Sequence, residues 1–187
     1  MSTPAQIISI FAMGFNILSF QFKAPKKIMG CQMIGTMLFA VSMFMLNAIT
    51  GGIMNILGMI RSIVYMNAER IPLSKKTLTT LFIATYFLSY ASVFLFFGGD
   101  PTAKNLLVEL LPVIAMTSIT IGFARNDSKT IRRMGFINSP CWLAYGIFVR
   151  SIGSILCEVV GIGSIIVGTI RHDLKKKSVK EKNPEQA

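Results

Sequence analysis

Charged residues are scarce in this chain, and acidic residues are the scarcest. Of 187 residues only 14% are charged, with 8 Asp and Glu against 19 Lys and Arg. A soluble domain carries about 25% charged residues. A soluble chain of this length also keeps too much surface to hide 52% hydrophobic residues in one core. The composition and the mean hydropathy of +0.60 therefore indicate an integral membrane protein whose outer surface faces hydrocarbon.

The residues that build metal sites, disulfide frameworks and catalytic centres are also few. Cys31, Cys141 and Cys157 lie in apolar runs and form no CxxC pair, so neither a disulfide framework nor a zinc site is expected. The single histidine, His172, has no partner motif, and the sequence contains no nucleotide-binding loop or nucleophile motif. We expect no enzymatic activity, no metal and no cofactor.

Seven apolar runs are long enough, or nearly so, to cross a membrane. About 20 apolar residues span a hydrocarbon core of ~30 Å as a helix. Strands of a barrel would alternate apolar and polar residues, whereas these runs are apolar at both parities. The sequence predicts an all-α, polytopic membrane fold with the sixth helix the shortest. The predicted spans are Ala5–Phe22, Ile28–Leu46, Ala48–Met66, Thr77–Phe97, Leu106–Ala124, Met134–Val149 and Ser151–Ile170.

The ends of these runs leave two alternatives open. The turns at Asn47 and Arg150 are so short that either the hairpins are very tight or the helix boundaries shift by a few residues. The start of the chain, Met1–Gln6, has no basic residue ahead of the first apolar run, unlike a typical signal peptide. We therefore expect the first run to be retained as a helix.

Lysine and arginine are strongly biased to one side of this arrangement. When the loops are assigned alternately, sixteen of the 19 basic residues lie on one side, only Lys104 and Arg150 lie on the other, and Arg61 lies within a span. Because basic loops stay in the cytoplasm, the bias predicts an outside N-terminus and a cytoplasmic C-terminus. Membrane topology also explains the net charge of +11 better than nucleic-acid binding does. The basic tail, residues 172–187, either contacts anionic lipid head groups or only anchors the topology.

An internal match indicates that the chain contains two related halves. At an offset of 110 residues, Leu46, Gly51, Ile56, Gly58, Ile60 and Arg61 fall on Leu156, Gly161, Ile166, Gly168, Ile170 and Arg171. Two three-helix units in the same orientation require one linker helix between them, which gives a 3+1+3 plan. The plan divides the chain into a first repeat (1–67), a loop and linker helix (68–105), a second repeat (106–171) and the tail (172–187). The alternative is convergent spacing of small residues.

An ordered set of short motifs carries a family resemblance. The motifs are Phe20–Lys23, Ile60–Arg61, Glu109–Ile114, Pro140–Trp142, Gly146, Ser151–Gly153, Glu158 and Ile170–Arg171. In these motifs the chain resembles the bacterial inner membrane protein family Imp-YgjV. In its 3+1+3 plan it resembles the SWEET and SemiSWEET sugar transporters of the PQ-loop group. The resemblance implies transport of a small neutral or polar solute, such as a sugar, by alternating access.

The chain departs from the family pattern at two positions. An Asn often stands three residues before the helix-3 arginine and before its helix-7 counterpart, but Gly58 and Gly168 occupy these positions here. The PQ dipeptide is also absent. These departures weaken the transfer of a sugar site to this chain.

Polar and aromatic residues inside the predicted spans are the candidates for a solute pathway. A charged side chain at membrane depth is costly and usually faces the interior of a bundle or a cavity. The pathway candidates are Asn55, Arg61, Asn138, Trp142 and Glu158. The alternative role for each of them is static helix packing.

Two further pairs of residues are candidates for moving parts. Glu109 and Arg150 lie near the predicted outer surface and could form an outer gate pair. Pro112 and Pro140 lie within predicted helices and could act as hinges, or merely bend them. The sequence thus favours a transporter or facilitator. The alternative is a non-transporting scaffold, sensor or assembly partner with the same fold.

The predicted topology can be tested by cysteine labelling. In a cysteine-free background, we expect K104C to react with a membrane-impermeant maleimide in intact cells. K26C and K177C should react only after the membrane is permeabilised, because basic loops remain in the cytoplasm. Labelling of Lys26 and Lys177 positions from opposite sides of the membrane would contradict the architecture.

Overall fold

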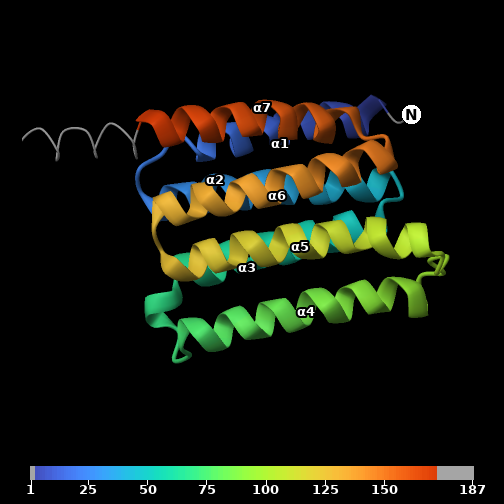
Figure 1. Cartoon of the computed structure of the whole chain (residues 1–187), viewed down its shortest axis with the longest axis horizontal. Coiled ribbons are helices and arrows are strands. Elements are labelled where there is room, and N and C mark those ends of the chain that lie inside the picture. The colour runs from blue at the N-terminus through green and yellow to red at the C-terminus, as the bar shows by residue number, and fades with distance from the viewer. Residues whose placement is uncertain (1–2, 172–187) are drawn as a thin grey trace, which may run out of the picture.

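The computed structural model describes residues 3–171, and within them every regular element is helical (Figure 1). The all-α prediction with seven helices is confirmed for these residues. The basic tail at 172–187, with His172, lies outside the described residues. The elements are α1 (Thr3–Ser19), α2 (Pro25–Met45), α3 (Ile49–Met66), the 3-10 helix η1 (Ala68–Arg70), α4 (Lys75–Phe96), α5 (Ala103–Arg125), α6 (Ser128–Val149) and α7 (Ile152–Thr169).

Capping side chains set where α4, α5, α6 and α7 begin. Asp127 caps α6 by accepting a hydrogen bond from Thr130 N at 2.9 Å, so α6 starts six residues before the predicted Met134. Burial alone would raise the pKa of Asp127, but the hydrogen bonds from Thr130 and Lys129 outweigh it and lower that pKa. Ser74 and Ser151 cap α4 and α7 in the same manner. The expectation that the sixth helix is the shortest is therefore wrong: α6 has 22 residues.

The two short turns are tight hairpins, which decides between the alternatives left open by the sequence. Asn47 and Arg150 both adopt the left-handed conformation, with φ of 57° and 56°. Ala48 N donates to Met43 O at 2.9 Å, and Ser151 N donates to Gly146 O at 3.0 Å. These bonds close the ends of α2 and α6 in the Schellman pattern.

Six of the helices form a closed ring, and α4 lies outside it. The order of neighbours around the ring is α1, α2, α3, α5, α6, α7 and back to α1. Helix α4 packs mainly against α5 and α3, and Figure 1 shows it at one edge of the assembly. This closure brings the two ends of the chain, α1 and α7, side by side.

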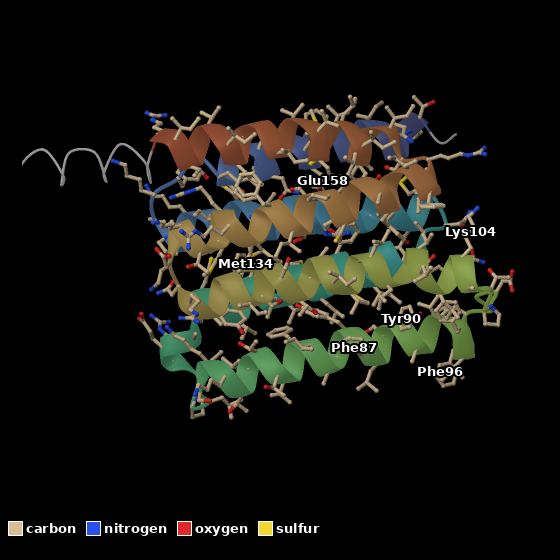
Figure 2. All side chains as sticks on the ribbon, viewed as in Figure 1. Phe87, Tyr90, Phe96, Lys104, Met134 and Glu158 are labelled. Carbon is tan, nitrogen blue, oxygen red and sulfur yellow. The ribbon has the colours of Figure 1, made fainter. Side chains whose placement is uncertain are left out.

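The outward faces of the helices are apolar, as contact with a bilayer requires. Five helices, α2, α3, α4, α5 and α7, are long and apolar enough to cross a membrane; α1 is apolar but has 17 residues, and α6 begins with a basic turn. Large apolar side chains point outward, most of all on α4, where Phe96 is 80% exposed (Figure 2). Such a surface is stable only against hydrocarbon or another apolar surface.

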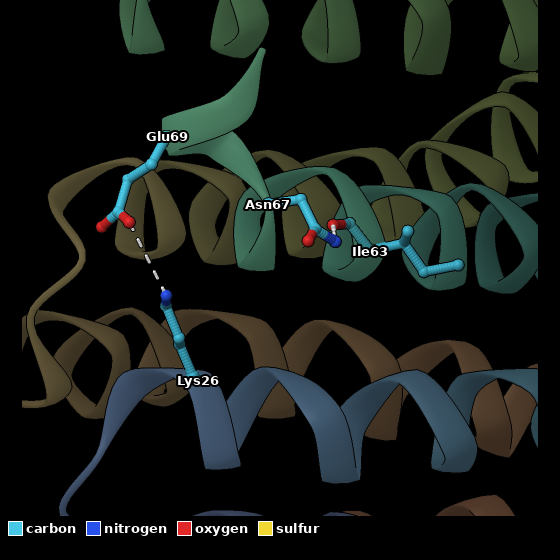
Figure 3. Close-up of polar contacts among 4 residues, drawn as sticks. All are labelled: Lys26, Ile63, Asn67 and Glu69. Atoms are coloured by element: carbon cyan, nitrogen blue, oxygen red, sulfur yellow. Dashed lines mark hydrogen bonds and ion pairs between the residues drawn. The ribbon is translucent and has the colours of Figure 1, made fainter.

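The basic loops lie together at one end of the bundle. Figure 1 shows the α1–α2, α3–α4 and α5–α6 connections and the end of α7 at the same end. There Lys26 and Glu69 approach to 3.8 Å, close to the hydrogen bond from Asn67 Nδ2 to Ile63 O (Figure 3). Both charged side chains are more than half exposed, so this pair contributes little stability. Which side of the membrane this end faces remains a prediction.

The helix bounds give a different spacing between α3 and α7 from the offset of 110 residues read in the sequence. Helices α3 and α7 both have 18 residues and begin 103 residues apart, at Ile49 and Ile152; Asn47 and Arg150 are separated by the same interval. The offset of 110 does not match these bounds. The difference is about two helical turns. Shifting one helix by two turns against the other places side chains on the same helix face, so a sequence comparison still pairs small residues with small ones and branched residues with branched ones. The 3+1+3 repeat itself stays a prediction.

Close packing of α7 against the end of α1 predicts an asymmetric effect of two glycine substitutions. A Cβ at Gly168 would lie 2.6 Å from the Phe20 carbonyl oxygen, whereas a Cβ at Gly163 would meet nothing within 4 Å. We expect Gly168→Ala to destabilise the fold by about 1–3 kcal/mol. Gly163→Ala should be neutral or stabilising by up to ~1 kcal/mol, because alanine is the better helix former. Thermal unfolding followed by circular dichroism in detergent measures both, and equal melting temperatures would contradict the packing.

Candidate functional site

A cavity of about 50 Å³ lies inside the ring of six helices. Each ring helix contributes to its lining, while α4 contributes nothing. The five predicted pathway candidates, which are spread over three helices in sequence, all line this single cavity: Asn55, Arg61, Asn138, Trp142 and Glu158. The ring thus brings the candidates together, while their part in a solute pathway stays a prediction.

Arg61 is a cation held in the interior without a carboxylate partner among the described residues. Its side chain is 2% exposed. Nη1 reaches Met116 O and Thr120 Oγ1 only at 3.5 Å each, and Nε has no hydrogen-bond partner. The guanidinium lies 4.7 Å from the centre of the Phe123 ring, which provides a cation–π contact. Part of the hydrogen-bonding capacity of Arg61 is therefore unused beside the cavity.

Helix α4 supports the residues of α5 that contact Arg61. The hydroxyls of Tyr86, on α4, and Thr120 lie 3.0 Å apart, and Thr120 Oγ1 also donates to Met116 O at 2.6 Å. Tyr86 is fully buried. Helix α4 thus lies outside the ring but fixes the groups on α5 that face Arg61.

Glu158 lines the cavity from α7, across the ring from α3. Its carboxyl lies beside the Ser139 hydroxyl of α6. Figure 2 labels Glu158 between α7 and α6. No ion pair joins Arg61 and Glu158 among residues 3–171, where Lys26 and Glu69 form the pair that lies within 4.0 Å. A guanidinium group and a carboxyl group therefore line one cavity without forming an ion pair.

The aromatic wall of the cavity is held rigidly. Trp142 is 7% exposed and packs edge-on against Tyr145, with ring centres 5.8 Å apart. The Tyr145 hydroxyl accepts a hydrogen bond from Gly51 N at 3.0 Å, which ties α6 to the first turn of α3. On the same helix, Asn55 donates to Gly51 O at 2.8 Å. Trp142 is thus a fixed wall inside the bundle, away from the ends where interfacial tryptophans lie.

Sequence reasoning missed several polar residues that also line the cavity. They are Asn16, Gln32, Thr36, Ser139 and Ser154. Gln32 and Thr36 lie one turn apart on α2, and this spacing of polar residues within an apolar run is a signal that could have identified them. Single serines are too common in membrane helices to be recognised in this manner.

The proposed outer gate pair is not formed in this conformation. Glu109 Oε2 and Thr50 Oγ1 are buried without hydrogen-bond partners, and the Glu109 carboxyl lies beside Thr50 and Tyr145. Arg150 is exposed and occupies the left-handed turn before α7. The Glu109 carboxyl therefore lies against α3 and α6, while Arg150 is exposed at the end of α6.

The two proline candidates lie within continuous helices. Pro112 is buried in α5, and Pro140 is exposed on α6. Each removes one backbone hydrogen bond from its helix, so both remain candidate hinges.

Close packing accounts for the glycines at positions 58 and 168. A Cβ at Gly58 would lie 3.0 Å from Met116 and 3.3 Å from Thr36, and a Cβ at Gly168 would meet the Phe20 carbonyl at 2.6 Å. An asparagine does not fit at Gly168 without moving backbone. The polar groups of this cavity consequently come from other positions.

The environment of Arg61 predicts that removing its charge stabilises the protein. An uncompensated buried charge is costly, and methionine keeps much of the apolar volume of the side chain. We expect Arg61→Met to raise the free energy of unfolding by about 1–3 kcal/mol. The control is Arg70→Met on the exposed 3-10 helix, which should change little. A lower melting temperature for Arg61→Met in detergent would show that the contacts with Phe123 and Thr120 outweigh the desolvation cost.

Among the described residues no group of three His, Cys, Asp or Glu side chains could hold a metal ion.

Similarity to known proteins agrees with the membrane character that the apolar helices indicate. No curated protein and no solved structure matches the chain. The model of the Imp-YgjV family, described as a bacterial inner membrane protein, matches residues 3–176. Since this match covers nearly the whole chain, the protein belongs to the Imp-YgjV family of multi-pass bacterial inner membrane proteins.

Proposed function

We propose that this protein is a transporter or facilitator for a small polar solute, with a binding site in the cavity inside the ring. The observation that carries the proposal is the convergence of Arg61, Glu158, Asn55, Asn138 and Trp142 on that one cavity. Ionisable side chains at membrane depth usually mark a pathway for a solute or ion. No catalytic role is part of the proposal.

Two pairs of lining residues occupy corresponding positions in the two proposed halves, which supports alternating access of the cavity to the two sides of the membrane. At the spacing of 103 residues given by the helix bounds, Phe39 corresponds to Trp142, and Asn55 corresponds to Glu158. All four residues line the cavity. Transporters built from repeats bind their solute at the interface between the repeats and open alternately as one bundle rocks against the other.

The two seams between the proposed halves differ in chemistry. Where α1 meets α7, Gln21 Nε2 donates to Ser164 Oγ at 2.8 Å, and Ser164 Oγ donates to Ile17 O at 2.9 Å. Where α3 meets α5, Arg61 makes contacts near 3.5 Å with Met116 and Thr120. The second seam has the longer, weaker bonds, so we propose that rocking opens the bundle there first.

The orientation forms part of the same proposal. The basic end of the bundle would face the cytoplasm, in accordance with the positive-inside rule. Residues 172–187 would continue from α7 on that side and contact anionic head groups.

A second candidate function is a non-transporting scaffold, sensor or assembly partner. The observation that favours it is α4, which lies outside the ring and exposes Leu88, Leu95 and Phe96 at 71–80%. Such a face could pack against another membrane protein as well as against lipid. A measurement of flux distinguishes the two functions.

The transporter proposal predicts solute flux in proteoliposomes that depends on the cavity. We expect the purified protein to move at least one solute from a panel of radiolabelled sugars and amino acids. Trp142→Ala and Glu158→Gln should reduce the initial rate by about tenfold, as loss of one good binding contact does. Glu69→Gln, which changes an exposed carboxylate, is the matched control and should retain the wild-type rate. Absence of flux across the whole panel would leave the scaffold function.

A further inference from the structure

The guanidinium group of Arg61 and the carboxyl group of Glu158 are the starting point, because they line one cavity and form no ion pair within the described residues. Arg61 is 2% exposed, and its Nε lacks a partner. Glu158 lines the same cavity from α7, beside the Ser139 hydroxyl. The two side chains do not approach within the 4.0 Å of an ion pair. In a site with little water, an unneutralised charge is unfavourable.

A ligand that neutralises both groups must carry both charges. A simple anion that binds Arg61 would face the Glu158 carboxylate, and a simple cation beside Glu158 would face the Arg61 guanidinium. A sugar would donate and accept hydrogen bonds but would leave both charges uncompensated. A zwitterion, with a carboxylate directed to Arg61 and an ammonium group directed to Glu158, would leave both groups ionised and paired.

The size of the cavity limits the ligand further. A cavity of about 50 Å³ holds roughly three to five water molecules, since one water needs about 10–15 Å³. Glycine has about as many non-hydrogen atoms as this space holds waters, whereas a hexose has more than twice as many. The remaining lining also suits a small amino acid, because Asn138 and Ser139 provide neutral polar groups beside the apolar wall of Trp142.

We propose that the cavity binds a small zwitterionic amino acid, with its carboxylate on Arg61 and its ammonium group on Glu158. This inference rests on the proposed function for its physiological meaning, and it names the substrate class of the same site.

The sole tryptophan of the chain offers a direct test. Trp142 lines the cavity, so its fluorescence in detergent-solubilised full-length protein reports on occupancy without any need for transport. We expect glycine to cause a saturable change in emission. Acetate, methylammonium and glucose should each bind at least about tenfold more weakly, because each lacks one or both charges.

Charge variants with matched controls test the two contacts separately. Arg61→Gln and Glu158→Gln should each weaken glycine binding at least about tenfold, and Glu158→Gln should raise the affinity for acetate relative to glycine. Glu69→Gln and Arg70→Gln change exposed residues near the basic end and should bind glycine as the wild-type protein does. If Arg61→Gln does not fold, the ligand series on the wild-type protein and Glu158→Gln still decide the question.

Three outcomes would each reject a zwitterion site. The first is that acetate binds as tightly as glycine. The second is that glucose displaces glycine while the charge variants bind glycine as the wild-type protein does, and the third is that glycine causes no saturable change in emission. The proposed function is judged separately by flux. Glycine binding without flux of any solute would reject transport and leave the site, whereas sugar flux without glycine binding would reject the site and leave transport.

Discussion

Hydrocarbon offers no hydrogen bonds, and this constraint organises the whole structure. Backbone groups must be satisfied within helices, and polar side chains must find partners on neighbouring helices or face an internal cavity. The outward faces accordingly carry exposed apolar residues such as Leu88 and Phe96, while Asn55, Arg61 and Ser62 are buried. The ring of six helices is the arrangement that gives these polar groups an interior to share.

Closing the ring depends on the seam between α1 and α7. Gln6 Oε1 accepts a hydrogen bond from Gly153 N at 3.1 Å, which satisfies a free amide at the start of α7. At the other end of the seam, Gly168 allows the Phe20 carbonyl to approach closely. Small residues and side-chain amides thus bring together the two ends of the chain, and the cavity exists because of this closure.

Helix α4 has a different role from the other six. It adds no residue to the cavity lining, and most of its surface faces outward. Through the Tyr86–Thr120 contact of 3.0 Å it nevertheless supports the part of α5 that lies against Arg61. Helix α4 therefore supports the residues of α5 that contact the buried guanidinium of Arg61.

The sequence by itself determined the fold class, the helices and the residues that are costly in a membrane. Hydropathy and charge are summed over many residues, so they identified the apolar runs and singled out Arg61, Glu158 and Trp142 reliably. Only the tertiary structure decided the helix boundaries and the neighbours of each residue. The start of α6 depends on a single capping carboxylate at Asp127. Likewise, Glu109 and Arg150 carry opposite charges, but the Glu109 carboxyl lies beside Thr50 and Tyr145, whereas Arg150 is exposed in a left-handed turn. Contacts between helices depend on which faces meet, and a linear pattern does not specify that.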